Sequence, residues 1–342
     1  MHHHGDGHAA RDGAIGAALR ERGAEVTFLS SLPAERLGVD RSVELPLDTD
    51  LGEDPGETPP ELHFAPLGSR GLSARMAAIA AWIADRRPDL LLVDVSVEVA
   101  MLARLCGVRV AYLRQSGERD DPPHRLAYRW ATGLLAPYPE RLEPASTPDG
   151  LRAKTGYVGA VTRFDGCERP RARGRPRRAL VLGEVGAELH ATIADAARGW
   201  QVLGPRPVDL DLLSRCAVVV APGGANTVAE AAFANCGLVC VPRPRPFGEQ
   251  VARGRDLARD GAAVVLSEPP EPGRWPLILE EARFRRDALA TWADGGGAGR
   301  AADYLLGLAG SSRSPASSQS TSPAAASSAS QPLAGHSPQC SR

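Results

Sequence analysis

Apolar residues follow two different spacings along most of this chain. Short uninterrupted apolar runs, such as 90–93 and 218–221, are typical of strands buried on both faces of a parallel sheet. Between such runs lie segments with apolar residues at helical spacing, for example 72–86, which places Ile79 and Ile83 on one face. This alternation predicts right-handed βαβ units, and therefore an α/β protein with parallel sheets.

The same pattern predicts further elements in both halves of the chain. Strands are expected at 25–30, 43–47, near His63, and at 108–113, 134–136, 157–159, 179–182, 200–203, 238–241 and 262–266. Helices are expected at 10–22, 98–105, 210–215, 225–235, 251–259, 275–289 and 301–308, and one more ends at Arg198. The charged segment 115–123 is predicted to be a loop. Each half is thus expected to form its own sheet.

The length and composition allow about two domains, because 342 residues that are 43% hydrophobic can bury a large core. We expect a first domain at 1–163, a basic, proline-rich linker at 164–178 and a second domain at 179–309. The tail at 310–342 is rich in Ser, Ala and Pro and has almost no large apolar residue. It cannot bury a core, so we expect it to be disordered.

The charge balance argues against nucleic acid and anionic membranes as partners, since the formal net charge is −1. The basic run 168–178 could be a nucleic-acid patch, but it has no interleaved aromatic residues and no basic domain around it. No run approaches the roughly 18 apolar residues of a membrane span, and no signal peptide is recognisable. The sequence therefore predicts a cytoplasmic protein.

A glycine turn at the end of strand 218–221 is the first candidate site. Gly223 and Gly224 precede the helix predicted from residue 225, so their bare amides lie at the positive end of its dipole. Such a turn suits a diphosphate. A plain strand-to-helix turn is the competing interpretation and has about equal weight on spacing alone.

Three polar residues after the turn extend this candidate site. Glu230 lies one helical turn further on, where its carboxylate could accept hydrogen bonds from the two hydroxyls of a ribose; a solvated helix residue is the alternative. Glu249 and Gln250 follow the next strand and could hydrogen-bond a sugar ring.

The motif G-G-x-N-T-x-x-E at 223–230, followed by a strand, P-x-P and a Gln that opens the next helix, resembles the donor half of GT-B glycosyltransferases. The nearest resemblance is to the MurG-like group with a family 28 C-terminal domain, and it extends over most of 1–290. It implies two Rossmann-like parallel-sheet domains that face a cleft. By motif it adds Asn226 and Thr227 to the residues expected to bind the donor.

The beginning of the chain carries the second part of the resemblance. Gly5, Asp6, Gly7 and His8 precede a predicted helix and resemble the G-x-G-H loop that opens the GT-B acceptor domain. Three histidines at residues 2–4 are too few for the usual purification tag. In that family a buried strand comes before this loop, so we expect the first domain to lack its first strand.

The resemblance also supplies a candidate catalytic pair. His8 is expected to be the base that deprotonates the acceptor, and Asp94, at the end of strand 90–93, its orienting partner. The alternatives are a helix-capping or phosphate-contacting role for His8 and a turn or N-cap role for Asp94.

The loop 115–123 is expected to lie on the acceptor side, where parallel sheets bind their ligands. Gly5, Gly7 and Asp120 are the residues we assign to the acceptor-side loops. Asp120, Asp121 and His124 could suggest a metal, but the sequence places no second His and no Cys beside them. We therefore expect a loop that shapes the acceptor cleft, with no metal and no cofactor.

The resemblance as a whole implies an inverting, metal-independent glycosyltransferase that uses a nucleotide-sugar donor, with UDP as the expected nucleotide. The acceptor, a small molecule, a glycan or a lipid-linked sugar, is not predicted, and membrane contact would be peripheral at most. Two alternatives stay open. One is a nucleotide-sugar hydrolase or epimerase of the same architecture, and the other is a truncated homologue without catalysis.

Overall fold

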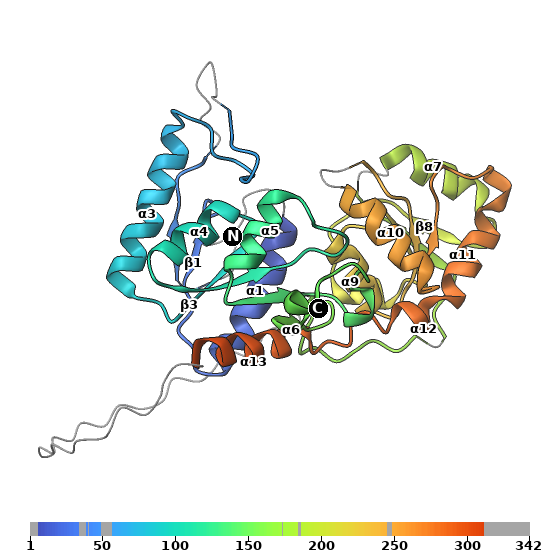
Figure 1. Cartoon of the computed structure of the whole chain (residues 1–342). Helices are drawn as coiled ribbons and strands as arrows, with labels where there is room; N and C mark the ends of the chain where they lie inside the picture. The colour runs from blue at the N-terminus through green and yellow to red at the C-terminus, as the bar shows by residue number, and fades with distance from the viewer. Residues whose placement is uncertain are drawn as a thin grey trace, which may run out of the picture.

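The chain forms two α/β lobes that lie side by side in this computed structural model (Figure 1). The structure describes residues 6–33, 39, 41–48, 57–172, 174–183, 186–244 and 248–310. Gly5 and the tail predicted to be disordered, from 311 onward, lie outside these residues. Within the described part, no helix has both the length and the apolar character needed to span a membrane.

The first lobe holds two parallel sheets. Its elements are α1 (Asp6–Glu21), β1 (Phe28–Ser30), β2 (Ser42–Glu44), α3 (Arg70–Arg86), β3 (Leu90–Asp94), α4 (Val97–Leu105), β4 (Arg109–Leu113), α5 (Pro122–Trp130), β5 (Gly133–Ala136), a 3-10 turn at Glu140–Leu142, α6 (Asp149–Ala153) and β6 (Thr155–Tyr157). One sheet pairs β1 with β2, and the other has the order β3-β4-β5-β6. All of these pairs are parallel.

The second lobe is built around one five-stranded parallel sheet. Its elements are β7 (Arg178–Val181), α7 (Gly186–Ala196), β8 (Gln201–Leu203), α8 (Leu210–Ser214), β9 (Val218–Ala221), α9 (Ala225–Phe233), β10 (Gly237–Cys240), α10 (Glu249–Arg259), β11 (Val264–Val265), a 3-10 turn at Pro272–Arg274, α11 (Trp275–Phe284) and α12 (Arg286–Leu289). The strand order is β11-β10-β9-β7-β8, with the fully buried β9 in the centre. The predicted class, two Rossmann-like α/β lobes with parallel sheets, is confirmed.

Three local predictions in the first lobe are wrong. Gly7 and His8, expected in a loop before the first helix, lie within α1, which already begins at Asp6. No strand forms near His63, because the backbone N–H groups of His63 and Phe64 donate to the carboxylate of Glu98 instead of to a neighbouring strand. Residues 122–130, which were not predicted to be helical, form α5. Asp121 caps that helix and prolines occupy its first turn, where a missing N–H costs nothing.

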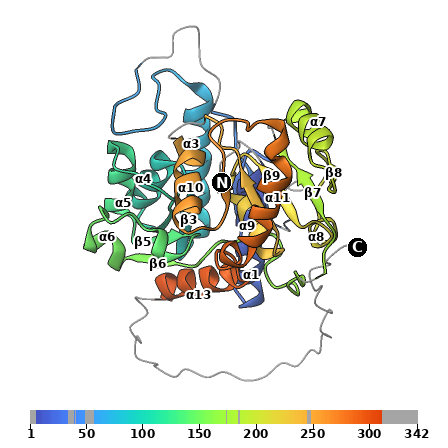
Figure 2. The same cartoon turned by 90° about the vertical axis from the view of Figure 1, so that its right-hand side faces the viewer.

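The last described helix, α13 (Gly297–Gly310), returns to the first lobe. It runs beneath that lobe in both views (Figures 1 and 2). Its small and apolar residues share one buried cluster with α1 and the strands β4 and β5; the members include Ala298, Ala301, Ala302 and Leu305 of α13 with Ile15, Leu113 and Leu135. Alanines let the helices approach closely, so α13 ties the chain's end to the first lobe.

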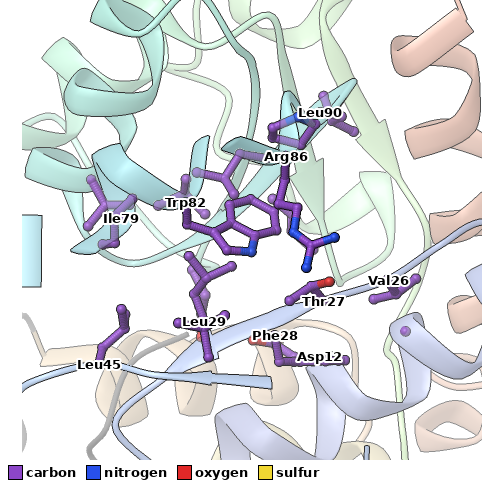
Figure 3. A pocket seen from close by; sticks show the side chains of 18 of the residues that line it. Asp12, Val26, Thr27, Phe28, Leu29, Leu45, Ile79, Trp82, Arg86 and Leu90 are labelled. Carbon is purple, nitrogen blue, oxygen red and sulfur yellow. The ribbon is translucent and has the colours of Figure 1, made fainter. Parts of the chain in front are cut away.

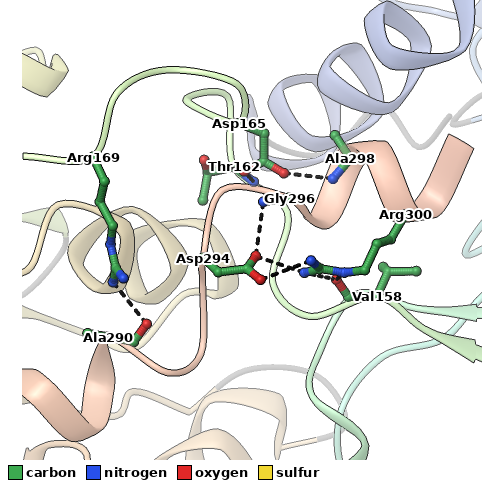
Figure 4. A network of polar contacts seen from close by, with 9 residues as sticks. All are labelled: Val158, Thr162, Asp165, Arg169, Ala290, Asp294, Gly296, Ala298 and Arg300. Atoms are coloured by element: carbon green, nitrogen blue, oxygen red, sulfur yellow. Dashed lines mark hydrogen bonds and ion pairs between the residues drawn. The ribbon is translucent and has the colours of Figure 1, made fainter. Parts of the chain in front are cut away.

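A polar network fixes the crossing that leads into α13 (Figure 4). Arg300 donates to the carbonyl oxygen of Val158 at 2.9 and 2.7 Å and to the carboxylate of Asp294 at 2.9 and 2.8 Å. Asp165 accepts from the backbone N–H of Ala298 at 2.7 Å. The two connections between the lobes are therefore bonded to each other.

A cavity of about 1260 Å³ lies between the edges of β1 and β3. In the described part of the chain, β1 pairs only with β2 and β3 only with β4, so the two strands do not pair with each other. Residues of α1 and α3 line the cavity together with both strands, and the indole of Trp82 projects toward β1 (Figure 3). The facing edges of β1 and β3 are therefore separated by this gap.

We expect this gap to be visible in hydrogen exchange. About half of the amides of β3 face the cavity, because successive amides of a strand point to opposite sides, whereas every amide of β9 faces a paired strand. A peptide covering 90–94 should therefore show a fast and a slow set of amides, and a peptide covering 218–221 only slow ones. Equally slow exchange throughout 90–94 would mean that the edge of β3 is covered.

Candidate functional site

The glycine turn after β9 has the geometry that the sequence predicts. Gly223 has a φ of +86°, and a Cβ at this position would lie 2.6 Å from the sulfur of Cys240, so only glycine fits. Gly224 is the N-cap of α9 and offers no side-chain cap. Asn226 and Thr227 lie in the first turn of the helix. The first amides of α9 therefore have no capping side chain from the N-cap residue, which is the arrangement that suits an anion.

Arg253 of α10 lies beside this turn and was not predicted as a site residue. Its side chain is buried and donates to the carbonyl oxygen of Gly223 at 2.9 Å and to the hydroxyl of Ser116 at 3.5 Å. Burial lowers the pKa of Arg253 from its ordinary value. The guanidinium thus links the glycine turn of the second lobe to the loop 115–121 of the first lobe.

Glu230 of α9 has a cationic partner in this structure. Arg163 contacts its two carboxylate oxygens at 3.0 and 3.2 Å and also donates to the carbonyl oxygen of Val208 at 2.7 Å. Burial raises the pKa of Glu230, and the charge of Arg163 only partly opposes that rise. Arg163 was not predicted as a site residue, because 67 residues separate the two partners.

Glu249 and Gln250, the two polar residues at the start of α10, differ in how deeply they are buried. Gln250 is buried, and its side-chain oxygen accepts from the backbone N–H of Arg243 at 3.0 Å. This hydrogen bond holds the loop that follows β10 in place. The side-chain nitrogen of Gln250 is then the group that could reach a sugar. Glu249 is the first residue of the helix, after Gly248 with a φ of +60°, and is partly exposed.

His8 and Asp94, the predicted catalytic pair, are in direct contact. The Nδ1 atom of His8 lies 2.5 Å from the carboxylate of Asp94, although 86 residues separate them in sequence. Asp94 is buried at the end of β3, whereas the side chain of His8 is 23% exposed. A carboxylate on Nδ1 fixes the imidazole tautomer, so that Nε2 is the nitrogen that can accept a proton.

Two further residues of α1 complete this cluster and were not predicted. The guanidinium of Arg11 lies 2.8 Å from Asp94 and 3.1 Å from Asp12. Burial raises the pKa of Asp94, but the charge of Arg11 and the hydrogen bond to His8 outweigh burial, so its pKa lies well below the usual range. Burial and the charge of Asp94 raise the pKa of Asp12 to about 6. Asp94 is therefore the ionised carboxylate and Asp12 the one that protonates first.

One hydrogen bond joins the two predicted halves of the site. The side-chain amide of Asn226 donates to the carbonyl oxygen of Gly7 at 2.7 Å. A Cβ on Gly7 would lie 3.3 Å from the same amide, so the approach of α1 to α9 is close. The residue next to His8 is thus bonded to the first turn of the helix that begins at the glycine turn.

The acceptor-side loop holds a group that the sequence did not predict. Asp120 is exposed, and it is Asp121 that bonds to His124, at 2.7 Å. The expectation of no metal rested on the lack of a second histidine near this loop. The structure shows that His63 lies near this loop, because its Nε2 is 3.8 Å from the carboxylate of Asp121.

The raised pKa of Asp12 predicts a pH dependence of stability. The folded state binds this proton more tightly than the unfolded state, with a pKa of about 6 against 3.8, so the contribution of Asp12 to stability is lost as pH rises from about 4 to 6. In urea unfolding, Asp12→Asn should be more stable than the parent at pH 7, by up to about 3 kcal/mol. The difference should disappear near pH 4. An Asp12→Asn variant that is less stable at pH 7 would show that ionised Asp12 is needed beside Arg11.

No protein-family model matches this sequence, and no curated protein was found that resembles it. Solved structures do share its fold. MurG of Acinetobacter baumannii is 17% identical, with a TM-score of 0.63 over 88% of this chain and 96% of that one. The glycosyltransferase VinC in complex with dTDP is 19% identical, with a TM-score of 0.59 over 90% and 98% of the two chains. A Listeria monocytogenes protein described as a UDP-N-acetylglucosamine 2-epimerase is 14% identical, with a TM-score of 0.57 over 90% and 93%.

Further neighbours are a glycosyltransferase of kitacinnamycin, the calicheamicin glycosyltransferase CalG4 and a plant UDP-glucosyltransferase. At these identities the likeness is one of fold. Together with the two parallel-sheet lobes and the returning helix α13, it shows that the chain has the MurG-like GT-B glycosyltransferase fold.

Proposed function

We propose that this chain is an inverting, metal-independent glycosyltransferase that moves a sugar from a UDP-linked donor to a hydroxyl of an acceptor. The observation that carries the proposal is the hydrogen bond between Asn226 and Gly7. It places the His8–Asp94 pair of one lobe beside the glycine turn of the other. This proximity supports a mechanism in which a base and a diphosphate-binding turn act on opposite sides of the anomeric carbon.

The donor is proposed to bind with its diphosphate at the first turn of α9. The amides that follow Gly224 and the helix dipole would stabilise the charge that grows on the diphosphate as the bond to the sugar breaks. Arg253 adds a buried cation next to Gly223. The neighbour VinC was solved with a nucleoside diphosphate, dTDP, which supports a ligand of this class.

The acceptor is proposed to lose its proton to His8. Ionised Asp94 holds the Nδ1–H of the imidazole, so Nε2 can take the hydroxyl proton. The acceptor oxygen then forms a bond to the anomeric carbon while the bond between that carbon and the diphosphate oxygen breaks. The diphosphate leaves with the electron pair, the proton stays on His8, and configuration at the anomeric carbon inverts.

The first prediction of this mechanism concerns His8. A positioned base contributes about 10² to 10⁴ in rate, so His8→Ala should lower kcat by that factor and leave UDP affinity within about twofold. Asp94→Asn should act in the same direction but less. Turnover is measured with a donor and acceptor pair found by screening, and affinity by calorimetry.

His190 of α7, in the second lobe, offers a matched control, since His190→Ala should keep full turnover. If His8→Ala instead abolished UDP binding, His8 would be a phosphate contact and not the base. Unchanged turnover in His8→Ala would remove it from the mechanism.

The second prediction concerns Glu230, which we propose binds the donor ribose. Hydrogen bonds to a charged group contribute about 1.5 to 3 kcal/mol, so Glu230→Ala should weaken UDP binding by roughly ten- to a hundredfold. Arg163→Met removes the partner of Glu230 but keeps the carboxylate, and it should weaken binding less. Calorimetry that shows the same UDP affinity in Glu230→Ala and the parent chain would exclude Glu230 from the donor site.

A nucleotide-sugar hydrolase or epimerase is the second candidate, and the fold shared with the Listeria protein favours it. The same glycine turn could bind the donor diphosphate, and the same base could act on a water molecule or on a proton of the sugar ring itself. Incubation with UDP-sugars in the absence of any acceptor separates the functions. A hydrolase would release UDP and free sugar at the full rate, an epimerase would convert the UDP-sugar into its epimer without net release of UDP, and a transferase would do either only slowly.

A further inference from the structure

Three side chains that can bind metals converge on the first lobe, away from the glycine turn. They are His63, Asp121 and His124, and their donor atoms all lie within 4.8 Å of one another. Asp121 and His124 are three residues apart at the start of α5, whereas His63 comes from the segment before α3. The two imidazole rings meet edge to face with centroids 4.7 Å apart. Folding, and not sequence proximity, brings these three residues together.

The surrounding structure holds these side chains in place. The backbone N–H groups of His63 and Phe64 donate to Glu98 at 2.7 and 3.0 Å, and Ser96 donates to the same carboxylate at 2.8 Å. His124 is 5% exposed and packs beside Tyr128. Glu98 and Tyr128 thus support the group from α4 and α5. Contacts that hold the ligands in place before a metal arrives favour its binding.

The donor set fits a zinc-type cation. Zinc is bound by imidazole nitrogens and carboxylate oxygens at about 2.0 to 2.2 Å in tetrahedral geometry, which separates donor atoms by roughly 3.4 Å. Two of the distances in this group lie on either side of that value, at 2.7 Å between Asp121 and His124 and 3.8 Å between Asp121 and His63, and no pair of donor atoms is more than 4.8 Å apart. Magnesium and calcium prefer oxygen ligands, and two imidazoles select against them.

We infer that His63, Asp121 and His124 form a binding site for Zn²⁺ or a similar divalent transition metal, with three protein ligands and a fourth position for water or a substrate atom. A cation at this place replaces the proton that His124 shares with Asp121. The inference does not rest on the proposed function, since the binding of the ion requires no sugar transfer. It is also compatible with a donor site that uses no metal, because these ligands belong to the acceptor-side lobe.

A metal ion at this site would also act on the loop 115–121. Asp121 ends the loop 115–121, and Ser116, at the other end of that loop, contacts Arg253 of the second lobe at 3.5 Å. Arg253 in turn donates to Gly223. An ion on Asp121 would therefore fix one end of the loop whose other end touches the glycine turn, so that metal occupancy orders the acceptor side.

The test is a calorimetric titration of the metal-free chain with Zn²⁺, with Mg²⁺ as the second probe. Residues 2–4 are histidines that could bind zinc by themselves, so every protein in the series carries His2, His3 and His4 replaced by Ser. We expect one Zn²⁺ per chain, a zinc-dependent rise in Tm, and no response to Mg²⁺.

His63→Gln is the decisive variant, because replacing Asp121 would also remove the cap of α5. It should weaken zinc binding at least tenfold and abolish the rise in Tm, while the Tm without metal stays unchanged. Asp120→Asn, which alters the exposed neighbouring carboxylate, and His190→Gln are the matched controls and should bind zinc like the parent. Equal zinc affinity in the parent and His63→Gln, or no stoichiometric binding to the parent, would overturn the inference.

Discussion

The buried ion pair between Arg11 and Asp94 is the interaction on which the arrangement of the first lobe depends. Their side chains are 8% and 2% exposed and lie 2.8 Å apart. A buried carboxylate without a partner would be costly, and it would take up a proton. Because Arg11 supplies the partner, Asp94 stays ionised and can hold His8. The same pair ties α1 to the end of β3, although β1 and β3 do not pair in the described part of the chain.

The position of the second lobe depends on contacts that lie far from one another in sequence. Helix α13 packs against α1 and the strands of the first lobe, and Arg300 bonds the crossing segment to Val158. On the opposite side, Asn226 reaches Gly7 and Arg253 reaches Ser116. The two lobes are therefore held at the base by packing and at the proposed reaction centre by single polar contacts, which a bound ligand could replace.

The sequence predicted the parts of this structure that depend on local chemistry. Four consecutive apolar residues followed by Pro-Gly-Gly predict a strand and a turn, and Asp94 follows a second apolar run at 90–93. The contact between His8 and Asp94 needed the family resemblance, because spacing alone gives no reason for residues 86 apart to meet.

What the sequence did not predict depends on the packing of distant segments. Arg163 and Arg253 look like ordinary surface arginines until folding places them against Glu230 and Gly223. His63 was assigned to a strand. Its backbone N–H instead donates to the carboxylate of Glu98, and this hydrogen bond places His63 in a cluster with Asp121.

The most direct measurement is a crystal structure of the chain with UDP bound. We expect the diphosphate oxygens to lie within hydrogen-bond distance of the backbone N–H groups at the start of α9, with His8 facing the terminal phosphate. The ribose hydroxyls should lie at Glu230, with Arg163 displaced or shared. UDP bound elsewhere, for example in the cavity between β1 and β3, with the first turn of α9 unchanged, would contradict the proposed donor site and the transfer mechanism built on it.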